Sequence, residues 1–315
     1  MKLKIGSRGS KLALWQSEYI RGLIMERNPG TEVEIVKIKT QGDKITDVAL
    51  SKIGGKGLFV KEIEDALLKG EAHIAVHSMK DMPTQIPEGL AIVATPERED
   101  PRDALVTKAA DSLENLPKKA RVGTSSLRRQ SQIKNIRPDL IMENLRGNLD
   151  TRLKKQEEGQ YDAIVLAAAG LRRMGWADKI TSYIPFEICL SAVGQGIIAI
   201  EAKEENLEVV NILKAFNHEP TYIAAIAERA FLRKLEGGCQ VPIAAHARIL
   251  RENGHEKLVL VGLVGSVSGD RIIKDSIEAA VKDGEKAGVT LAETLLSRGA
   301  GDILKEVYGR EVTGY

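Results

Sequence analysis

The sequence predicts an α/β protein with two lobes and a smaller α+β third domain. Its 315 residues are enough for two to three domains. Strand-like and helix-like patterns alternate through the first two-thirds of the chain, which is typical of a parallel sheet covered by helices. A composition of 43% hydrophobic and 29% charged residues excludes a disordered, fibrous or membrane protein.

The first unit has a βαβαβ pattern. We expect strands at 2–5, 33–39 and 74–76, with a glycine-containing turn at 6–10 and a helix at 59–68. The helix after the turn has one apolar face, formed at helical spacing by Leu12, Trp15, Tyr19 and Leu23. Sites in such folds lie beyond the carboxyl ends of the strands.

A linker at 98–103 precedes the second unit. Strands are expected at 104–106, 121–123, 141–143 and 161–166, and hydroxyl residues at 124–126 mark a helix start. The segment 191–201, with Gly194 and Gly196 before an apolar run, is predicted to cross back to the first unit. Two lobes that are linked twice would hinge.

The third unit begins after His218 and Pro220. Its predicted elements are a helix at 221–236, strands at 258–264 and 271–277, and a helix at 288–305. The resulting domain boundaries are 1–98 with 197–216 for the first domain, 99–196 for the second, and 217–315 for the third.

Charge and cysteine content narrow the possible functions. The net charge of +2 gives no overall field that favours nucleic acid or membrane. No secretory signal or spanning segment is apparent, so we expect a cytoplasmic protein. Two cysteines without paired spacing do not indicate a zinc site. His73 and His77 would lie about 13 Å apart on a strand, too far to share a metal, so no metal site is predicted.

The densest positive charge lies in 121–155, which contains nine basic and three acidic residues. Within it, the run 123–129 joins a strand end to a helix start and carries Arg128 and Arg129, an arrangement that can bind a carboxylate or phosphate. A serine N-cap followed by a solvated basic helix is the alternative. Nucleic acid is disfavoured because these 35 residues contain no aromatic side chain for base stacking.

Asp81 follows the predicted buried strand at 74–76, where crevice sites form. An ionised carboxylate there can accept N–H hydrogen bonds and stabilise a developing cation, but an aspartate that caps the turn before Pro83 explains it equally well. The glycine-rich segment 51–57 is either a lid or a connector.

The two cysteines have different surroundings. Cys189 lies among apolar residues and is expected in the core, whereas Cys239 follows Gly237 and Gly238 in a tight turn that would leave its thiol accessible. An accessible thiol indicates a nucleophile, a redox switch or an attachment point, and a turn cysteine without chemistry stays possible.

At these residues the sequence resembles the porphobilinogen deaminase family along nearly its whole length. The matching stretches stand in the family's order and at its spacing: 76–81, 123–129, 144–148 with 151–153, 169–171, 192–196, and 228–229 through 238–239. The resemblance implies two lobes of type II periplasmic-binding-protein-like architecture with a third domain. It also implies a transferase of haem and porphyrin biosynthesis that joins four porphobilinogen molecules head to tail into hydroxymethylbilane and releases ammonia.

The resemblance also implies roles for single residues. It implies a dipyrromethane cofactor covalently attached to Cys239 through a thioether, and Asp81 as the catalytic carboxylate. The carboxylate arms of cofactor and substrate imply many basic and hydroxyl ligands. The implied cofactor ligands are Lys80, Arg128, Arg129, Ser78, Thr124 and Ser126; the implied substrate ligands are Arg8, Arg146, Arg152 and Arg173; and Lys56 and Phe59 match the family's mobile loop.

Two further expectations follow. Arg173 is preferred over Arg172 as a ligand, and Arg128 and Arg129 are expected to face ligand carboxylates rather than to support the core. The expected partner is porphobilinogen, with no nucleic acid or membrane, and the chain is expected to act as a monomer. The alternative function is a non-catalytic, cytosolic two-lobed module that binds an anionic small molecule, which would leave Cys239 and Asp81 without roles.

Overall fold

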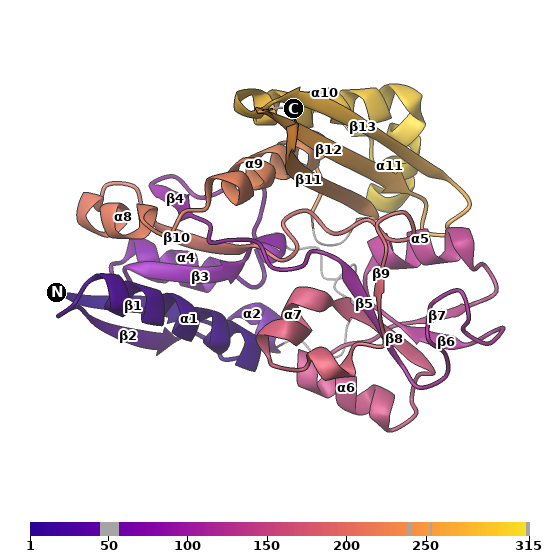
Figure 1. Ribbon diagram of the computed structural model, residues 1–315, viewed down its shortest axis with the longest axis horizontal. Coiled ribbons are helices and arrows are strands. Elements are labelled where there is room, and N and C mark those ends of the chain that lie inside the picture. The colour runs from indigo at the N-terminus through magenta and orange to yellow at the C-terminus, as the bar shows by residue number, and fades with distance from the viewer. Residues whose placement is uncertain (45–56, 239–240, 253, 313–315) are drawn as a thin grey trace.

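The computed structural model describes residues 1–44, 57–238, 241–252 and 254–312. Over these residues the chain forms two five-stranded sheets and one three-stranded sheet, each with its own helices (Figure 1). We call the parts built on the five-stranded sheets the first and second lobes, and the part built on the three-stranded sheet the third domain. The predicted α/β architecture of two lobes and a smaller third domain is confirmed.

The first lobe has the strand order β2-β1-β3-β10-β4. Its elements are β1 (Lys2–Ser7), α1 (Lys11–Arg27), β2 (Glu32–Lys37), α2 (Gln41–Lys44), α4 (Lys61–Leu68), β3 (Ile74–Ser78), β4 (Leu90–Ala94), β10 (Ile198–Lys203) and α8 (Leu207–Lys214). The predicted βαβαβ series is present, because β1 pairs in parallel with both β2 and β3. The sheet as a whole is mixed rather than parallel, since β10 runs antiparallel to β3 and β4.

The second lobe repeats this strand order as β7-β6-β8-β5-β9. Its elements are β5 (Asp103–Thr107), β6 (Arg121–Gly123), α5 (Leu127–Ile136), β7 (Ile141–Glu143), α6 (Leu149–Glu157), β8 (Ala163–Ala167), α7 (Ala168–Arg173) and β9 (Ser182–Ile184). β5 occupies the position that β10 has in the first lobe, antiparallel to the strand beside it. Each lobe therefore contains one strand that the chain inserts on arriving from the other lobe.

The two crossings between the lobes are short. The first runs through 98–102 into β5, and the second runs through 194–197 into β10. Gly194 and Gly196 have φ values of +70° and +86° in the second crossing. A Cβ on Gly196 would lie 2.3 Å from the carbonyl oxygen of Glu99 in the first crossing. Glycine is required here because the two crossings pack directly against each other.

The third domain packs three helices against its sheet. It consists of α9 (Glu219–Lys234), β11 (Ile243–Glu252), β12 (His255–Gly265), β13 (Ile272–Ala280), α10 (Gly284–Leu295) and α11 (Gly301–Tyr308). Phe231 of α9 lies in the core between sheet and helices. The helix predicted at 288–305 is two helices, which are divided by a π-helical segment containing Gly299 at φ +94°. Strand β11 was not predicted.

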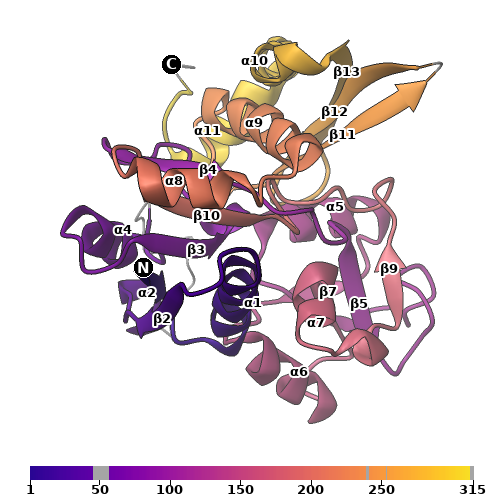
Figure 2. The same cartoon turned by 60° about the vertical axis from the view of Figure 1, so that its left-hand side comes forward.

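Helix α1 buries a different face from the predicted one. Gln16, Ile20 and Ile24 are buried, whereas Tyr19 is 42% exposed and stacks on Trp15 with ring centroids 5.5 Å apart. Apolar side chains stand at helical spacing on both faces of α1, so spacing alone did not identify the face that carries Ile20 and Ile24 toward the core. Gln16 on this face hydrogen-bonds to Ser78. α1 also lies against α7 of the second lobe (Figure 2). None of the described helices is long and apolar enough to cross a membrane.

Candidate functional site

The predicted site residues come from both sides of the gap between the lobes. Lys80 and Asp81 lie in a single 3-10 turn, η1 (Met79–Asp81), directly after β3 of the first lobe. Arg128 and Arg129 lie in the first turn of α5 in the second lobe. Both positions follow the carboxyl end of an inner parallel strand, β3 or β6, where crevice sites form.

Arg128 and Arg129 share one buried carboxylate, that of Asp103. Arg128 donates to Asp103 Oδ2 at 2.7 Å and to the carbonyl oxygen of Leu190 at 2.7 Å. Arg129 donates to Asp103 Oδ1 at 2.7 Å and to the carbonyl oxygen of Val165 at 2.9 Å. The arginines are only 4% and 6% exposed. The expectation that they do not support the core is wrong, because they tie α5 to β5 and β8.

Lys80 lies within electrostatic reach of this group. Burial lowers the pKa of Lys80 to about 8. The negative charges of Asp81 and Asp103 raise this pKa, whereas the positive charges of Arg129 and Arg128 lower it further. Lys80 of the first lobe therefore interacts electrostatically with charged side chains of the second lobe. A pKa near 8 also means that Lys80 is largely cationic at neutral pH and is held so by the two carboxylates.

Arg152 and Arg146 extend the positive cluster along the second lobe. Burial lowers the pKa of Arg152 to about 10, the charges of Arg129 and Arg146 lower it further, and the charge of Asp81 raises it. Burial also lowers the pKa of Arg146. Arg152 lies on α6 and donates from Nε to the carbonyl oxygen of Gly147 at 2.8 Å. These two arginines thus join Lys80, Asp81 and Arg129 in one charged group.

Arg173 and Arg172 point to different surroundings. Arg173 donates to the carbonyl oxygen of Gly196 at 2.7 Å, and burial lowers its pKa to about 10. Arg172 is exposed and pairs with Glu99 at 2.7 Å. Arg172 is therefore engaged at the surface, while Arg173 is a partly buried cation beside the second crossing.

Arg8 directly follows β1 and contacts Asp43 and Phe59. Its guanidinium lies 2.5 Å from Asp43 Oδ1 and 4.3 Å from the centre of the Phe59 ring. Burial raises the pKa of Asp43, but the hydrogen bonds and charge of Arg8, with a hydrogen bond from Thr40, outweigh it and lower the pKa. Asp43 thus stays ionised and fixes Arg8. Lys56, the other predicted loop residue, lies outside the described residues.

The three predicted hydroxyl ligands are all engaged in local hydrogen bonds. Ser126 is the N-cap of α5 and accepts from the backbone N–H of Arg129, as the sequence predicts. Thr124 Oγ1 accepts from the N–H of Ser126 at 3.2 Å. Ser78 exchanges hydrogen bonds with Gln16. Because Thr124 and Ser126 act as acceptors here, their own O–H groups stay available as donors.

The structure tests the prediction for Cys189, which was expected in the core. Cys189 is fully buried, and burial together with the charge of Asp103 raises its pKa to about 12, so its thiol is protonated and inert. Cys239 lies outside the described residues. Beside it, a Cβ on Gly237 would lie 2.3 Å from Leu232, whereas one on Gly238 would meet no atom within 4 Å.

The charge balance of this group fits a polycarboxylate. Among the described residues, five cations surround two carboxylates: Lys80, Arg128, Arg129, Arg146 and Arg152 against Asp81 and Asp103. Burial lowers the pKa values of Lys80, Arg146 and Arg152. Several cations grouped in this way suit a ligand that carries more than one carboxylate.

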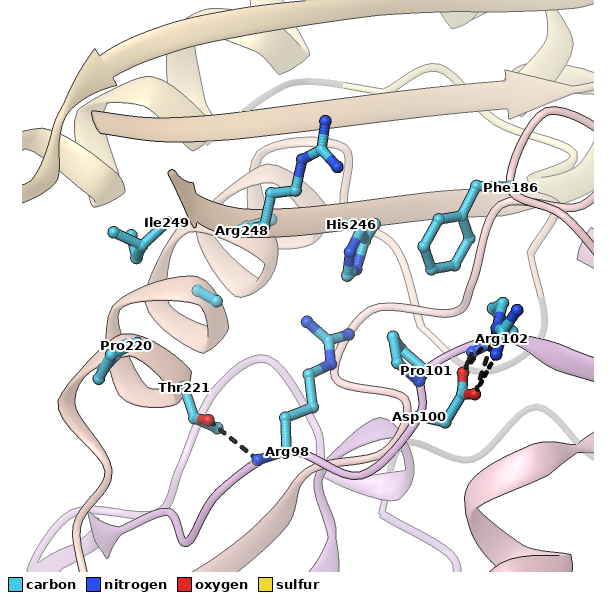
Figure 3. Close-up of a pocket in the computed structure, with 12 residues that line it drawn as sticks. Arg98, Asp100, Pro101, Arg102, Phe186, Pro220, Thr221, His246, Arg248 and Ile249 are labelled. Carbon is cyan, nitrogen blue, oxygen red and sulfur yellow. Dashed lines mark hydrogen bonds and ion pairs between the residues drawn. The ribbon is translucent and has the colours of Figure 1, made fainter. Parts of the chain in front are cut away.

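A separate cavity of about 380 Å³ lies between the first crossing and the third domain (Figure 3). Two of the three arginines that line it pair with carboxylates, Arg98 with Glu228 at 2.6 Å and Arg102 with Asp100 at 2.6 Å. None of the predicted site residues lines this cavity. No group of three or more potential metal-binding side chains occurs among the described residues.

Sequence analysis missed Asp103 and Gln195. Asp103 stands in a segment whose charges and proline resemble a linker, and Gln195 is a neutral residue between two glycines. Gln195 Nε2 donates to Asp103 Oδ1 at 2.9 Å and to the carbonyl oxygen of Pro101 at 2.8 Å. The one available signal was a carboxylate at the start of a strand predicted to be buried, which requires a cationic partner.

Comparison with known proteins identifies a family that this chain matches. Residues 3–211 match the family model described as porphobilinogen deaminase, dipyromethane cofactor binding domain. Residues 222–297 match the model of the porphobilinogen deaminase C-terminal domain. The two models together account for most of the chain.

Curated relatives match over the full length. Porphobilinogen deaminases of Geobacter metallireducens and Geobacter sulfurreducens are each 52% identical to this chain, over 99% of it and 96% of their own length. The porphobilinogen deaminase of Desulforamulus reducens is 49% identical over 98% of this chain and 99% of its own. Among solved structures, the methionine-binding protein MetQ has a TM-score of 0.44 at 14% identity, over 72% of this chain and 91% of that one.

Proposed function

The chain belongs to the porphobilinogen deaminase family, and we propose that its interlobe cleft is where this family's reaction takes place. It is a transferase of tetrapyrrole biosynthesis that polymerises porphobilinogen into hydroxymethylbilane with release of ammonia. The observation that carries the assignment to the cleft is the excess of partly buried cations that Lys80 and Asp81 share with the arginines of the second lobe.

The family's cofactor is a dipyrromethane. When bound, it supplies the pyrrole position to which new units are added. We assign its attachment to Cys239, because Cys189 is buried and carries a protonated thiol.

Asp81 is proposed as the catalytic carboxylate. It follows β3 at the mouth of the cleft, and its negative charge acts on both Lys80 and Arg152. A carboxylate at that point can accept pyrrole N–H groups and stabilise the cation that forms when porphobilinogen loses ammonia.

The cationic side chains are proposed to bind the carboxylate arms. Arg128, Arg129 and Lys80, with the hydroxyls of Ser78, Thr124 and Ser126, would hold the cofactor. Substrate and growing chain would be held by Arg8, Arg146, Arg152 and Arg173. Guanidinium groups suit this task because they bind carboxylates through two parallel hydrogen bonds. Phe59, stacked on Arg8, and Lys56 would cover the substrate side of the cleft.

We also propose the finer organisation that the sequence predicts. The three domains would comprise 1–98 with 197–216, 99–196, and 217–315. The separate sheets and the two crossings support these ranges. The protein would act as a cytoplasmic monomer on a small molecule. Burial of Arg128 and Arg129 supports a small-molecule ligand over nucleic acid or membrane, which would need exposed charge.

The experiment that tests the function is a stoichiometric assay of the purified full-length chain. We expect porphobilinogen to be consumed with one ammonia released per molecule and with hydroxymethylbilane formed. A two-lobed binding module is the alternative. Tight binding of porphobilinogen without any ammonia release would favour that module and contradict the proposal.

A further inference from the structure

We propose that Asp103 is a positioning residue that holds Arg128 and Arg129 in the orientation in which they bind cofactor carboxylates. This inference rests on the proposed function, and it assigns to Asp103 a role in cofactor binding that it performs without touching the cofactor.

The Asp103 carboxylate is completely buried and receives donors on both oxygens. Oδ1 accepts from Arg129 Nε at 3.1 Å and Nη2 at 2.7 Å, and also from Gln195. Oδ2 accepts from Arg128 Nη1 at 2.7 Å and from the thiol of Cys189 at 3.3 Å. One short side chain thus fixes both guanidiniums from a single point.

Each guanidinium has a second anchor on a backbone carbonyl, Leu190 for Arg128 and Val165 for Arg129. Because a guanidinium is planar, two contacts in its plane fix the direction of its remaining N–H groups. The hydrogen bonds among the described residues use three of the five N–H groups of Arg129. A ligand carboxylate can therefore be met by donors whose orientation is already set.

The charge balance separates this arrangement from an ordinary buried ion pair. A single carboxylate lies between two guanidiniums, and the cation of Lys80 lies within reach of the same group. Asp103 therefore compensates enough charge for burial but leaves a net positive field that a ligand can neutralise. A second aspartate would stabilise the pair more and remove its attraction for an anion.

Gln195 connects this group to both crossings between the lobes. Its side-chain amide bridges Asp103 Oδ1 and the carbonyl oxygen of Pro101 in the first crossing, while Gln195 itself belongs to the second. The direction of the two guanidiniums is therefore set relative to the junction of the lobes and not by α5 alone.

The test replaces Asp103 with Asn in the full-length chain and measures the share of folded protein that carries a covalent pyrrole adduct by intact mass. Asp100→Asn is the matched control, because Asp100 lies in the same crossing and pairs with Arg102, outside the proposed site. We expect the loaded share to fall by about tenfold in Asp103→Asn, as loss of a charge-assisted hydrogen bond would produce. It should stay near the parental share in Asp100→Asn.

A second readout responds to charge and not to structure alone. Lys80 faces Asp81, Arg128, Arg129 and Asp103, and the charge of Asp103 raises its pKa. For Asp103→Asn protein that carries the adduct, turnover is measured against pH. The decrease in turnover on the alkaline side should occur at a lower pH than in the parent. A folded variant with parental loading and an unchanged profile would overturn the proposal.

If Asp103→Asn does not fold, Asp103→Glu provides the test, because it keeps the negative charge but moves it by one methylene group. If Asp103→Glu folds and loads poorly, the positioning role is supported. Parental loading of Asp103→Glu, or failure of both variants to fold, would make the residue purely structural. Absence of an adduct in the parent protein itself would instead contradict the proposed function.

Discussion

Glu228 of α9 and Arg98 of the first crossing form a two-point ion pair, with Arg98 Nη1 to Glu228 Oε1 at 2.6 Å and Nη2 to Oε2 at 3.3 Å. Glu228 is completely buried and also accepts the backbone N–H groups of Gly194, in the second crossing, and Ala247, in β11. One carboxylate therefore joins the third domain to both connections between the lobes.

Removing the charge of Glu228 should be strongly destabilising. In Glu228→Gln the guanidinium of Arg98 would stay nearly buried without its counter-charge, which typically costs about 3 to 5 kcal/mol. Glu285→Gln is the control, because Glu285 forms an exposed pair with Arg233 that is worth about 1 kcal/mol or less. Urea unfolding curves measure the stability of both variants. Equal, small losses of stability would show that Glu228 does not hold the third domain to the two crossings.

Glu64 should make the protein less stable as pH rises. It is 6% exposed, and burial, together with the charge of Glu201, raises its pKa to about 7 from an ordinary 4.5, although His77 acts against the shift. The folded state therefore binds more protons than the unfolded state between these values, so this contribution is fully present below about pH 4.5 and is lost as pH rises through 7.

Glu64→Gln removes this dependence. We expect the variant to be more stable than the parent at pH 8 and the difference to shrink at pH 5, as measured by urea midpoints. Glu71→Gln, at an exposed position of the same lobe, provides the comparison. A stability difference that is the same at both pH values would rule out titration of Glu64 as its cause.

Asp81→Asn should preserve the fold and reduce turnover. Asparagine keeps the shape and capping ability of aspartate but lacks its charge. If Asp81 only capped the turn, the variant would have near-normal activity. By analogy with the loss of an oxyanion-hole donor, we expect a fall of about a hundred- to a thousandfold. Turnover is measured on cofactor-loaded protein beside the melting temperature, and activity within a few-fold of the parent would remove Asp81 from catalysis.

Arg152→Gln should weaken substrate binding without destabilising the chain. Arg152 lies beside Arg129 and Arg146, which lower its pKa, so removing its charge relieves repulsion in the absence of a ligand. The expected result is a KM raised about tenfold or more, the scale of a lost charge-assisted hydrogen bond, at an unchanged melting temperature. Lys154→Gln, on the exposed side of α6, should leave KM unchanged. A parental KM in Arg152→Gln would place Arg152 outside the binding site.

The sequence was sufficient where a local pattern determines the structure. Ser126 was recognisable as a helix N-cap, Cys189 as a core residue, and 191–201 as a return crossing, because each depends on its immediate neighbours. The buried face of α1 was not identified, since apolar residues occur on both faces and the hydrogen bond between Gln16 and Ser78, 62 residues away, forms only in the folded lobe.

The candidate site was predicted as a set of side chains but not as a network. Arg128 and Arg129 are adjacent in helix α5, yet their shared partner Asp103 lies 25 and 26 residues away, on strand β5. The position of Asp103 at the start of a predicted strand indicates that it needs a cationic partner but does not identify that partner. Which carboxylate meets which arginine depends on strand order, and that appears only in the folded lobe.

The intact mass of the purified full-length protein tests the central claim most directly. The account predicts a mass above that of the sequence by one dipyrromethane, lost in Cys239→Ser and retained in Cys189→Ser. Cys189→Ser is the control, because Cys189 is fully buried. A folded, active parent protein with the unmodified sequence mass, or an adduct that persists in Cys239→Ser, would contradict the account.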